Sequence, residues 1–184
     1  MQGSTVTVKG RVACEMNTCD ELLATEIIFD NVLEPLNPPE AAALLSALIF
    51  EERSDYDPPL TTRLESARAQ CEEIHRALGT LSEAHGLPPA SFAGDGNSKK
   101  AGLNFGLAAV VYQWARGVPF SEITEMTTVQ EGSIVRTITR LDELCRDFRN
   151  ASRVVGNPHL YRKMEAASQC IRRDIVFAGS LYIT

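Results

Sequence analysis

The stretch TVQEGSIVRTITRLDELCRDFRNASRVV, residues 128–155, decides the fold, because its apolar residues recur at helical spacing over most of its length. Intervals of four, three, four and three residues put them on one face of a long helix. These residues are Ile134, Ile138, Leu141, Cys145 and Phe148. The pattern predicts an amphipathic helix that lies on a hydrophobic core, opened by a capping box of Thr128 and Glu131 and ended by Gly156.

Charged residues occupy another face of this predicted helix. Arg136, Arg140, Glu143 and Asp147 follow one another at intervals of four, three and four residues, which places them within about 60° of one another. One interpretation is a solvent-exposed stripe of ion pairs, each worth roughly 0.3 kcal/mol. The other is a rigid rail whose arginines meet phosphates or stack on bases. Spacing alone favours the first interpretation.

The rest of the chain also follows helical patterns. Asn37 precedes Pro38 and Glu40, a start signal in which Asn37 caps the helix and Glu40 caps in return. A similar pair, Thr62 with Glu65, is expected to open a helix that ends near Gly86. We expect seven helices, at about residues 20–30, 38–53, 62–86, 99–116, 121–126, 128–155 and 158–178.

The first residues differ in pattern from the helical remainder. TVTVKGRV alternates between apolar and polar residues and predicts an extended segment, although a lone strand would have no partner in this chain. We therefore predict an all-α fold, a helical bundle of about seven helices with a short extended N-terminal segment. Residues 1–18 form the extended lead-in and residues 19–184 a single helical-bundle domain, with a flexible loop rich in Gly, Pro and Ser at 86–98.

Charge is unevenly distributed along the 184 residues, whose net charge is −6. Residues 1–135 hold 9 basic and 19 acidic residues, whereas residues 136–184 hold 9 basic and 5 acidic ones. Such a split fits a basic face for a polyanion on an acidic body, or two halves that neutralise each other by packing. With no apolar run near the ~20 residues of a membrane span and no apolar signal core, we expect a cytosolic or nuclear protein without membrane contact.

Residues that could carry catalysis or a metal are scarce. The five cysteines are an odd number without a CxxC pair, which indicates free thiols rather than a disulfide framework. A zinc site of Cys14, Cys19 and a histidine is conceivable, but none of the three histidines has ligand spacing. Without a phosphate loop or a serine–histidine–acid pattern, we expect no catalytic residue, no metal and no cofactor in this chain.

A helix-turn-helix is the alternative for residues 119–146, where a short helix, a tight turn and a longer helix follow one another. The second helix, residues 129–150, carries four arginines and four acidic residues. Zero net charge is poor for entry into a DNA groove, where neutralisation of phosphates drives affinity. A DNA-binding or protein-interaction helical module nevertheless remains the alternative hypothesis.

Several blocks resemble, in order, the C-terminal DSHCT domain of exosome-associated DExH-box RNA helicases. They are GRVACEM (10–16), LNFGLAAVVYQWARGVPFSEI (103–123), QEGSIVRTITRLDELCR (130–146) and RRDIVFAGSLY (172–182). The resemblance covers the chain from about Lys9 to Tyr182. LNFGL before VVYQWARG, the RxxGNPxL pattern at 153–160 and DIVFA make the chain more similar to the cytoplasmic superkiller (Ski-complex) branch than to its nuclear relative.

The resemblance implies a helical bundle that packs on two RecA-like motor domains and closes the channel for the 3′ single strand of RNA. It implies that one long helix, the ratchet helix, faces the RNA. Arg140 and Glu143 in TRLDELCR match that helix's functional arginine and glutamate, so both are implied to contact RNA. Arg136 shares their face and is a third RNA-binding candidate.

The resemblance also implies an activity that belongs to the parent protein, an ATP-dependent 3′-5′ RNA helicase of the DExH-box kind. This sequence has no Walker A lysine, no DExH box and no inserted arch, so ATP and Mg are expected in motor domains outside it. The isolated chain would be a fragment without ATPase activity. Implied partners are the 3′ end of single-stranded RNA, the motor domains, the superkiller complex subunits and the exosome. Implied locations are the cytoplasm, or the nucleus for the nuclear branch.

Overall fold

The computed structural model describes residues 5–52, 54, 59–86, 103–173 and 176 of the chain. In this part it contains eight α-helices and one 3-10 helix and no strand, which confirms the predicted all-α bundle. The elements are α1 Val8–Ala13, α2 Glu21–Phe29, α3 Pro38–Ser46, α4 Thr62–Ala84, η2 Phe105–Leu107, α5 Ala108–Ala115, α6 Phe120–Glu125, α7 Glu131–Val155 and α8 Pro158–Ile171.

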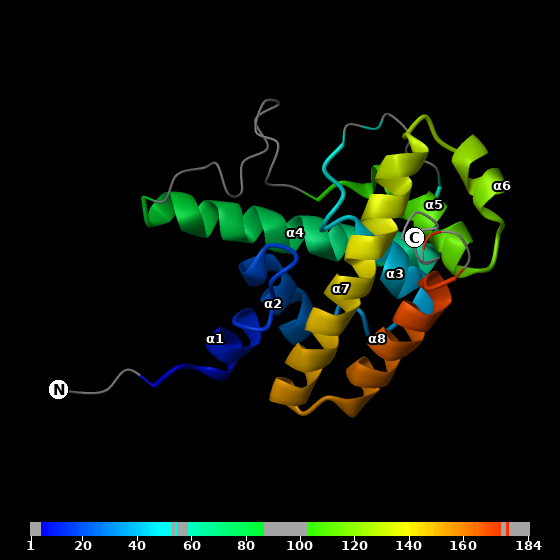
Figure 1. The fold of residues 1–184 in the computed structure, drawn as a ribbon. Coiled ribbons are helices and arrows are strands. Elements are labelled where there is room, and N and C mark those ends of the chain that lie inside the picture. Colours follow the sequence, from blue (N-terminus) through cyan, green and yellow to red (C-terminus); the bar gives the residue numbers. More distant parts are fainter. Residues whose placement is uncertain (1–4, 53, 55–58, 87–102, 174–175, 177–184) are drawn as a thin grey trace, which may run out of the picture.

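The centre of the bundle is a hairpin of α7 and α8, which lie side by side (Figure 1). α7 ends where Gly156 adopts the left-handed conformation at φ +77°, which a glycine accepts without strain. The Asn157 side chain then caps α8, and Pro158 takes the first helical position, where no N–H is needed. α3 packs against both α7 and α8 and also against α5. These contacts fix the direction of α7 within the molecule.

The core lies between α3, α5, α7 and α8, and it holds the fully buried Trp114. The indole Nε1 of Trp114 donates to the carbonyl of Ile171 at 2.9 Å, so its polar atom is satisfied. The Arg173 guanidinium lies 3.6 Å from the ring centroid and donates to the Trp114 carbonyl. These contacts fasten the end of α8 to α5.

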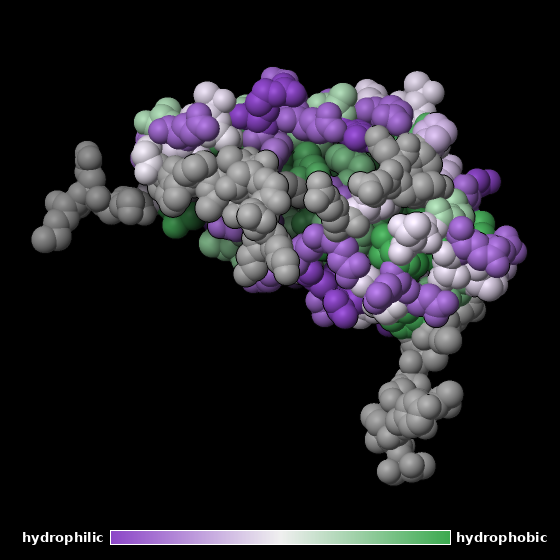
Figure 2. All heavy atoms as spheres, turned by 90° about the horizontal axis from the view of Figure 1, so that it is seen from above, coloured by the Kyte–Doolittle hydropathy of each residue, from purple (hydrophilic) through white to green (hydrophobic). Residues whose placement is uncertain are grey.

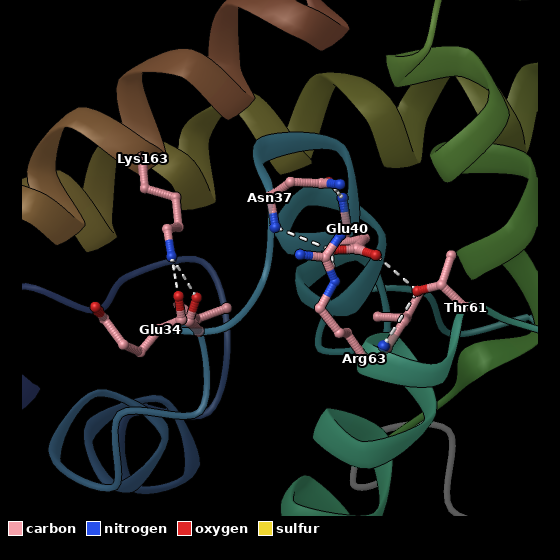
Figure 3. A network of polar contacts seen from close by, with 8 residues as sticks. Glu34, Asn37, Glu40, Thr61, Arg63 and Lys163 are labelled. Atoms are coloured by element: carbon pink, nitrogen blue, oxygen red, sulfur yellow. Dashed lines mark hydrogen bonds and ion pairs between the residues drawn. The ribbon is translucent and has the colours of Figure 1, made fainter.

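Buried polar groups tie the first helices to the rest of the molecule (Figure 3). The predicted capping box is confirmed, since Asn37 and Glu40 bond to each other's backbone N–H groups at 2.9 Å. The buried Glu40 also accepts from the Thr61 hydroxyl at 2.7 Å and lies 3.4 Å from Arg63 Nε. Nearby, Lys163 Nζ donates to the carbonyl oxygens of residues 33 and 34, so α8 holds the turn that follows α2.

α4 extends from the body of the molecule as a separate arm (Figure 1). Its first half packs through the buried Leu64, Ala67 and Cys71, and its far end exposes Leu81. The predicted end of this helix near Gly86 is confirmed, since α4 ends at Ala84 and Gly86 follows with φ +66°. Polar and apolar side chains are intermingled on the face seen from above in Figure 2. No helix of the described residues is long and apolar enough to cross a membrane.

Several predicted boundaries are wrong. Residues Val8–Ala13, expected to be extended, form α1, because the Thr7 hydroxyl caps the helix and Val12 is buried where α1 packs on α2 and α7. α3 ends at Ser46 rather than near residue 53, and turns follow it. α4 and α7 begin after Thr61 and Gln130 rather than at the predicted caps. Most of the loop predicted at 86–98 lies outside the described residues.

Candidate nucleic-acid interface

The buried face of α7 is the predicted one. Each of the apolar residues of the pattern has an exposed fraction of 0%: Ile134, Ile138, Leu141, Cys145 and Phe148. Through this face α7 contacts α8, α3 and α1. The helix is therefore held along its length, and side chains on its other face project from a rigid support.

The exposed face of α7 only partly overlaps the charged face that the spacing predicted. Beyond the first turn of the helix, which holds the exposed Glu131, its exposed polar side chains are those of Arg136, Thr139, Glu143, Arg146 and Arg153. At about 100° per residue they fall within about 100° of one another. Of the predicted RNA-binding residues, Arg136 and Glu143 belong to this exposed face of α7. Arg146 and Arg153, which the charge spacing did not select, belong to it as well.

Arg140 lies at the edge of the exposed face, with its guanidinium in contact with the body of the protein. Nη2 is 3.3 Å from the carbonyl oxygen of Thr18, and Nη1 is 3.4 Å from that of Ile49. Nη1 also lies 3.3 Å from Oε1 of Glu51, and the exposed side-chain fractions are 37% for Arg140 and 54% for Glu51. Arg140 thus links α7 to the segment before α2, at Thr18, and to the segment after α3, at Ile49 and Glu51. Its side chain still reaches solvent.

Asp147 does not belong to the exposed face, which corrects its place in the predicted charged stripe. Its exposed fraction is 8%. Oδ2 accepts from the backbone N–H groups of Asn17 and Thr18 at 2.9 and 3.0 Å and from the Thr18 hydroxyl at 2.8 Å. Because a buried carboxylate needs such donors, Asp147 is a structural residue that holds the link between α1 and α2.

Two carboxylates adjoin the predicted arginines. Arg136 and Arg140 line a small hollow of about 90 Å³ together with Glu51, Glu52 and Ser133. The hydroxyl of Ser133 donates to Oε1 of Glu52, which orients that side chain. The local charge is therefore balanced, and an incoming phosphate would compete with Glu51 for Arg140.

The other candidate sites gain no support from the geometry. Cys14 is exposed and Cys19 is half-buried, and burial raises the pKa of the Cys19 thiol to about 12. Within the described ranges, no three His, Cys, Asp or Glu side chains are grouped to hold a metal ion. For the helix-turn-helix alternative, α6 makes its main contacts with α5, so the geometry adds nothing in its favour.

Comparisons with known proteins agree with the resemblance noted in the sequence. The family model described as the DSHCT (NUC185) domain matches residues 3–178. The chain is 48% identical over 181 residues to the DExH-box ATP-dependent RNA helicase DExH11 of Arabidopsis thaliana, covering 97% of this chain and 13% of that protein.

Two human proteins are also similar. Identity to Superkiller complex protein 2 of Homo sapiens is 45%, covering 98% of this chain and 14% of that protein. Identity to the Exosome RNA helicase MTR4 of Homo sapiens is 39%, covering 97% and 17%. The chain therefore corresponds to a small part of each of these much longer proteins. Because the family model spans nearly the whole chain, the chain belongs to the DSHCT domain family.

Proposed function

We propose that this chain is the helical, ratchet-type domain of an ATP-dependent 3′-5′ RNA helicase, and that α7 lines the channel for the single strand. Similarity to proteins named as RNA helicases supports the class of the parent protein. The motor domains of that parent bind ATP and Mg and carry out hydrolysis. The present chain packs on them and contributes no catalytic group.

One observation carries the channel-lining role: an acidic chain presents arginines on one face of a long helix whose opposite face is buried in the core. The net charge of the chain is −6, yet Arg136, Arg146 and Arg153 are all exposed on α7. An arginine fork can hydrogen-bond to successive phosphates without reading bases. Contacts that ignore sequence are those that a strand-translocating protein needs.

The proposed RNA-binding residues are Arg140, Glu143 and Arg136. The phosphate backbone displaces Glu51 from Arg140, and this exchange costs little, since an exposed ion pair is worth only about 0–1 kcal/mol. Arg136 contacts a neighbouring phosphate. Glu143 lies on the same exposed face and repels the backbone, which keeps the strand from binding too tightly to move.

The biological setting follows from the branch of the family. Greater similarity to Superkiller complex protein 2 than to MTR4 supports decay of RNA in the cytoplasm, with single-stranded 3′ ends delivered to the exosome. Superkiller complex subunits would then be the partners of the parent protein. A nuclear location would apply if the parent belonged to the MTR4 branch.

Unwinding of a 3′-tailed RNA duplex by the full-length protein tests the proposal. Arg140→Ala should slow unwinding several-fold while basal ATP hydrolysis continues, because the catalytic groups lie in the motor domains. Arg76→Ala is a suitable control, since Arg76 is an exposed arginine on α4 that pairs with Glu73. Unwinding by Arg140→Ala at the rate of the control would contradict the proposal.

A further inference from the structure

A second cluster of basic residues lies at the end of the α7–α8 hairpin, away from Arg140. An open hollow of about 560 Å³ is lined there by Arg153 near the end of α7 and by Tyr161 and Arg162 on α8, with Asn157 and Glu165. Both Arg153 and Arg162 are exposed. The hollow is concave, cationic at its rim and accessible to solvent, which suits an anionic ligand.

Tyr161 holds the Arg153 side chain in place. Arg153 Nη2 lies 3.1 Å from the Tyr161 hydroxyl, and its guanidinium is 5.0 Å from the ring centroid. The Arg149 guanidinium is 5.8 Å from the same ring and 3.9 Å from Oε1 of Glu165. Because Arg153 is already ordered, it loses less side-chain entropy when it binds an anion.

The cluster continues the exposed face of α7. Arg146 lies between Arg140 and Arg153 on the helix, and Arg153 is about 20 Å from Arg140 along the axis at about 1.5 Å per residue. At a stacked rise of about 3.4 Å, one strand would need at least about six nucleotides to cover that length, because Arg153 also lies about 140° from Arg140 around the helix. The ring of Tyr161 already carries two guanidinium groups, so the hollow offers charge rather than a platform for stacking a base.

From this geometry we infer that Arg153 and Arg162 form a second, sequence-independent contact for the phosphates of the same RNA strand that passes Arg140. The inference rests on the proposed function of α7 and extends it: the strand would follow the exposed face of α7 from Arg136 to the end of the hairpin. A strand held at two points about six nucleotides apart slides back less easily when one contact is released.

The test measures how tightly the full-length protein binds single-stranded RNA tails of graded length. The double variant Arg153→Ala/Arg162→Ala should bind long tails about three- to tenfold more weakly and lower the salt slope by about 1.4, which is 0.7 for each lost phosphate contact. Its loss and the loss caused by Arg140→Ala should begin at tail lengths that differ by about six nucleotides.

Two variants control for folding and for charge. The double variant Arg76→Ala/Arg116→Ala removes two exposed arginines elsewhere, of which Arg116 lies 5.4 Å from the ring of Tyr112 much as Arg153 lies over Tyr161. It should bind tails of every length like the wild type. Arg153→Lys/Arg162→Lys should restore most of the affinity, because a phosphate contact tolerates a point charge.

The outcomes separate this inference from the proposed function. If Arg140→Ala weakens binding and Arg153→Ala/Arg162→Ala leaves it unchanged at every tail length, the second contact is wrong, and the hollow is open to an acidic peptide instead. An equal loss with short and long tails would also overturn it. If neither variant changes binding, the proposed role of α7 fails as well. Because Arg162 is exposed, the single variant Arg162→Ala should remain folded, and it replaces the double variant in the test if the double variant unfolds.

Discussion

Arg140 and Asp147, two turns apart on α7, bind the same residue, Thr18. Arg140 donates to its carbonyl at 3.3 Å, and Asp147 accepts from its N–H at 3.0 Å and from its hydroxyl at 2.8 Å. The link between α1 and α2 is thereby fixed to α7 through a pair of opposite charges. Of the four charged residues that share one helical spacing, these two are bonded to the body, while Arg136 and Glu143 are exposed.

Replacing Asp147 should cost stability. Asp147→Ala removes the acceptor of three hydrogen bonds at a buried position, so we expect the free energy of unfolding to fall by about 2 kcal/mol. Hydrogen exchange followed by mass spectrometry should show faster exchange of the amides of Asn17 and Thr18. Glu143→Ala, at an exposed position on the same helix, is the control and should change neither measurement.

Arg140 should contribute to both stability and unwinding, whereas Arg136 should contribute to unwinding alone. Because Arg140 bonds two backbone carbonyls and Glu51 in a partly exposed position, Arg140→Ala should lower the free energy of unfolding by about 1 kcal/mol. Arg136→Ala should stay within about 0.5 kcal/mol of the wild type, as exposed substitutions usually do. Thermal melting and unwinding assays on the same proteins separate the two effects. A large loss of stability in Arg136→Ala would indicate a structural role.

Glu143→Gln should tighten RNA binding. The substitution removes a negative charge from the exposed face of α7, so RNA affinity at low salt should rise about two- to threefold. Unwinding should slow, since a strand that binds more tightly moves less readily, and the gain in affinity should vanish as salt screens the charge. Titration of single-stranded RNA at two salt concentrations measures this, and weaker binding by Glu143→Gln would show that Glu143 does not face the strand.

The cysteines should differ in reactivity. Burial raises the pKa of the thiols of Cys19, Cys71 and Cys145 to about 12, whereas Cys14 is exposed. Alkylation near pH 8 should therefore modify Cys14 first, as peptide mass spectrometry can show. In the unfolded chain these thiols ionise with a pKa near the usual 9.0, so their burial stabilises the fold below that pH. This contribution should be lost as the pH rises from about 9 to about 12, where the unfolded thiols ionise and the buried ones do not. Equal labelling of Cys14 and Cys145 in the native protein would contradict the predicted difference in reactivity.

The helical core could be predicted from the sequence because local patterns specify it. Apolar residues three and four apart on α7 are all fully buried, and Gly156 with Asn157 and Pro158 makes the turn of the hairpin. α1 could not be predicted, since the alternation of TVTVKGRV resembles a strand. Its helix depends on burial of Val12 against α2 and α7, which no local pattern reveals.

The exposed face of α7 could be predicted only in part. Helical spacing places Asp147 on the same face as Arg136, Arg140 and Glu143. It cannot show which part of that face is covered by a segment distant in the sequence. Thr18, 129 residues away in the sequence, covers Asp147 and the inner edge of Arg140. For the same reason the charge spacing does not point to Arg146 and Arg153, although both are exposed in the structure.

Site-specific photo-crosslinking tests the central claim, that the exposed face of α7 meets RNA. A photoreactive residue replaces Thr139, which is exposed on α7 near Arg136 and Glu143, and the control replaces Thr80, which is exposed on α4. The full-length protein is then bound to 3′-tailed RNA and irradiated. If α7 faces the RNA, position 139 should crosslink to the single-stranded tail and position 80 should not. Absence of a crosslink from position 139, or equal crosslinking from both positions, would contradict it.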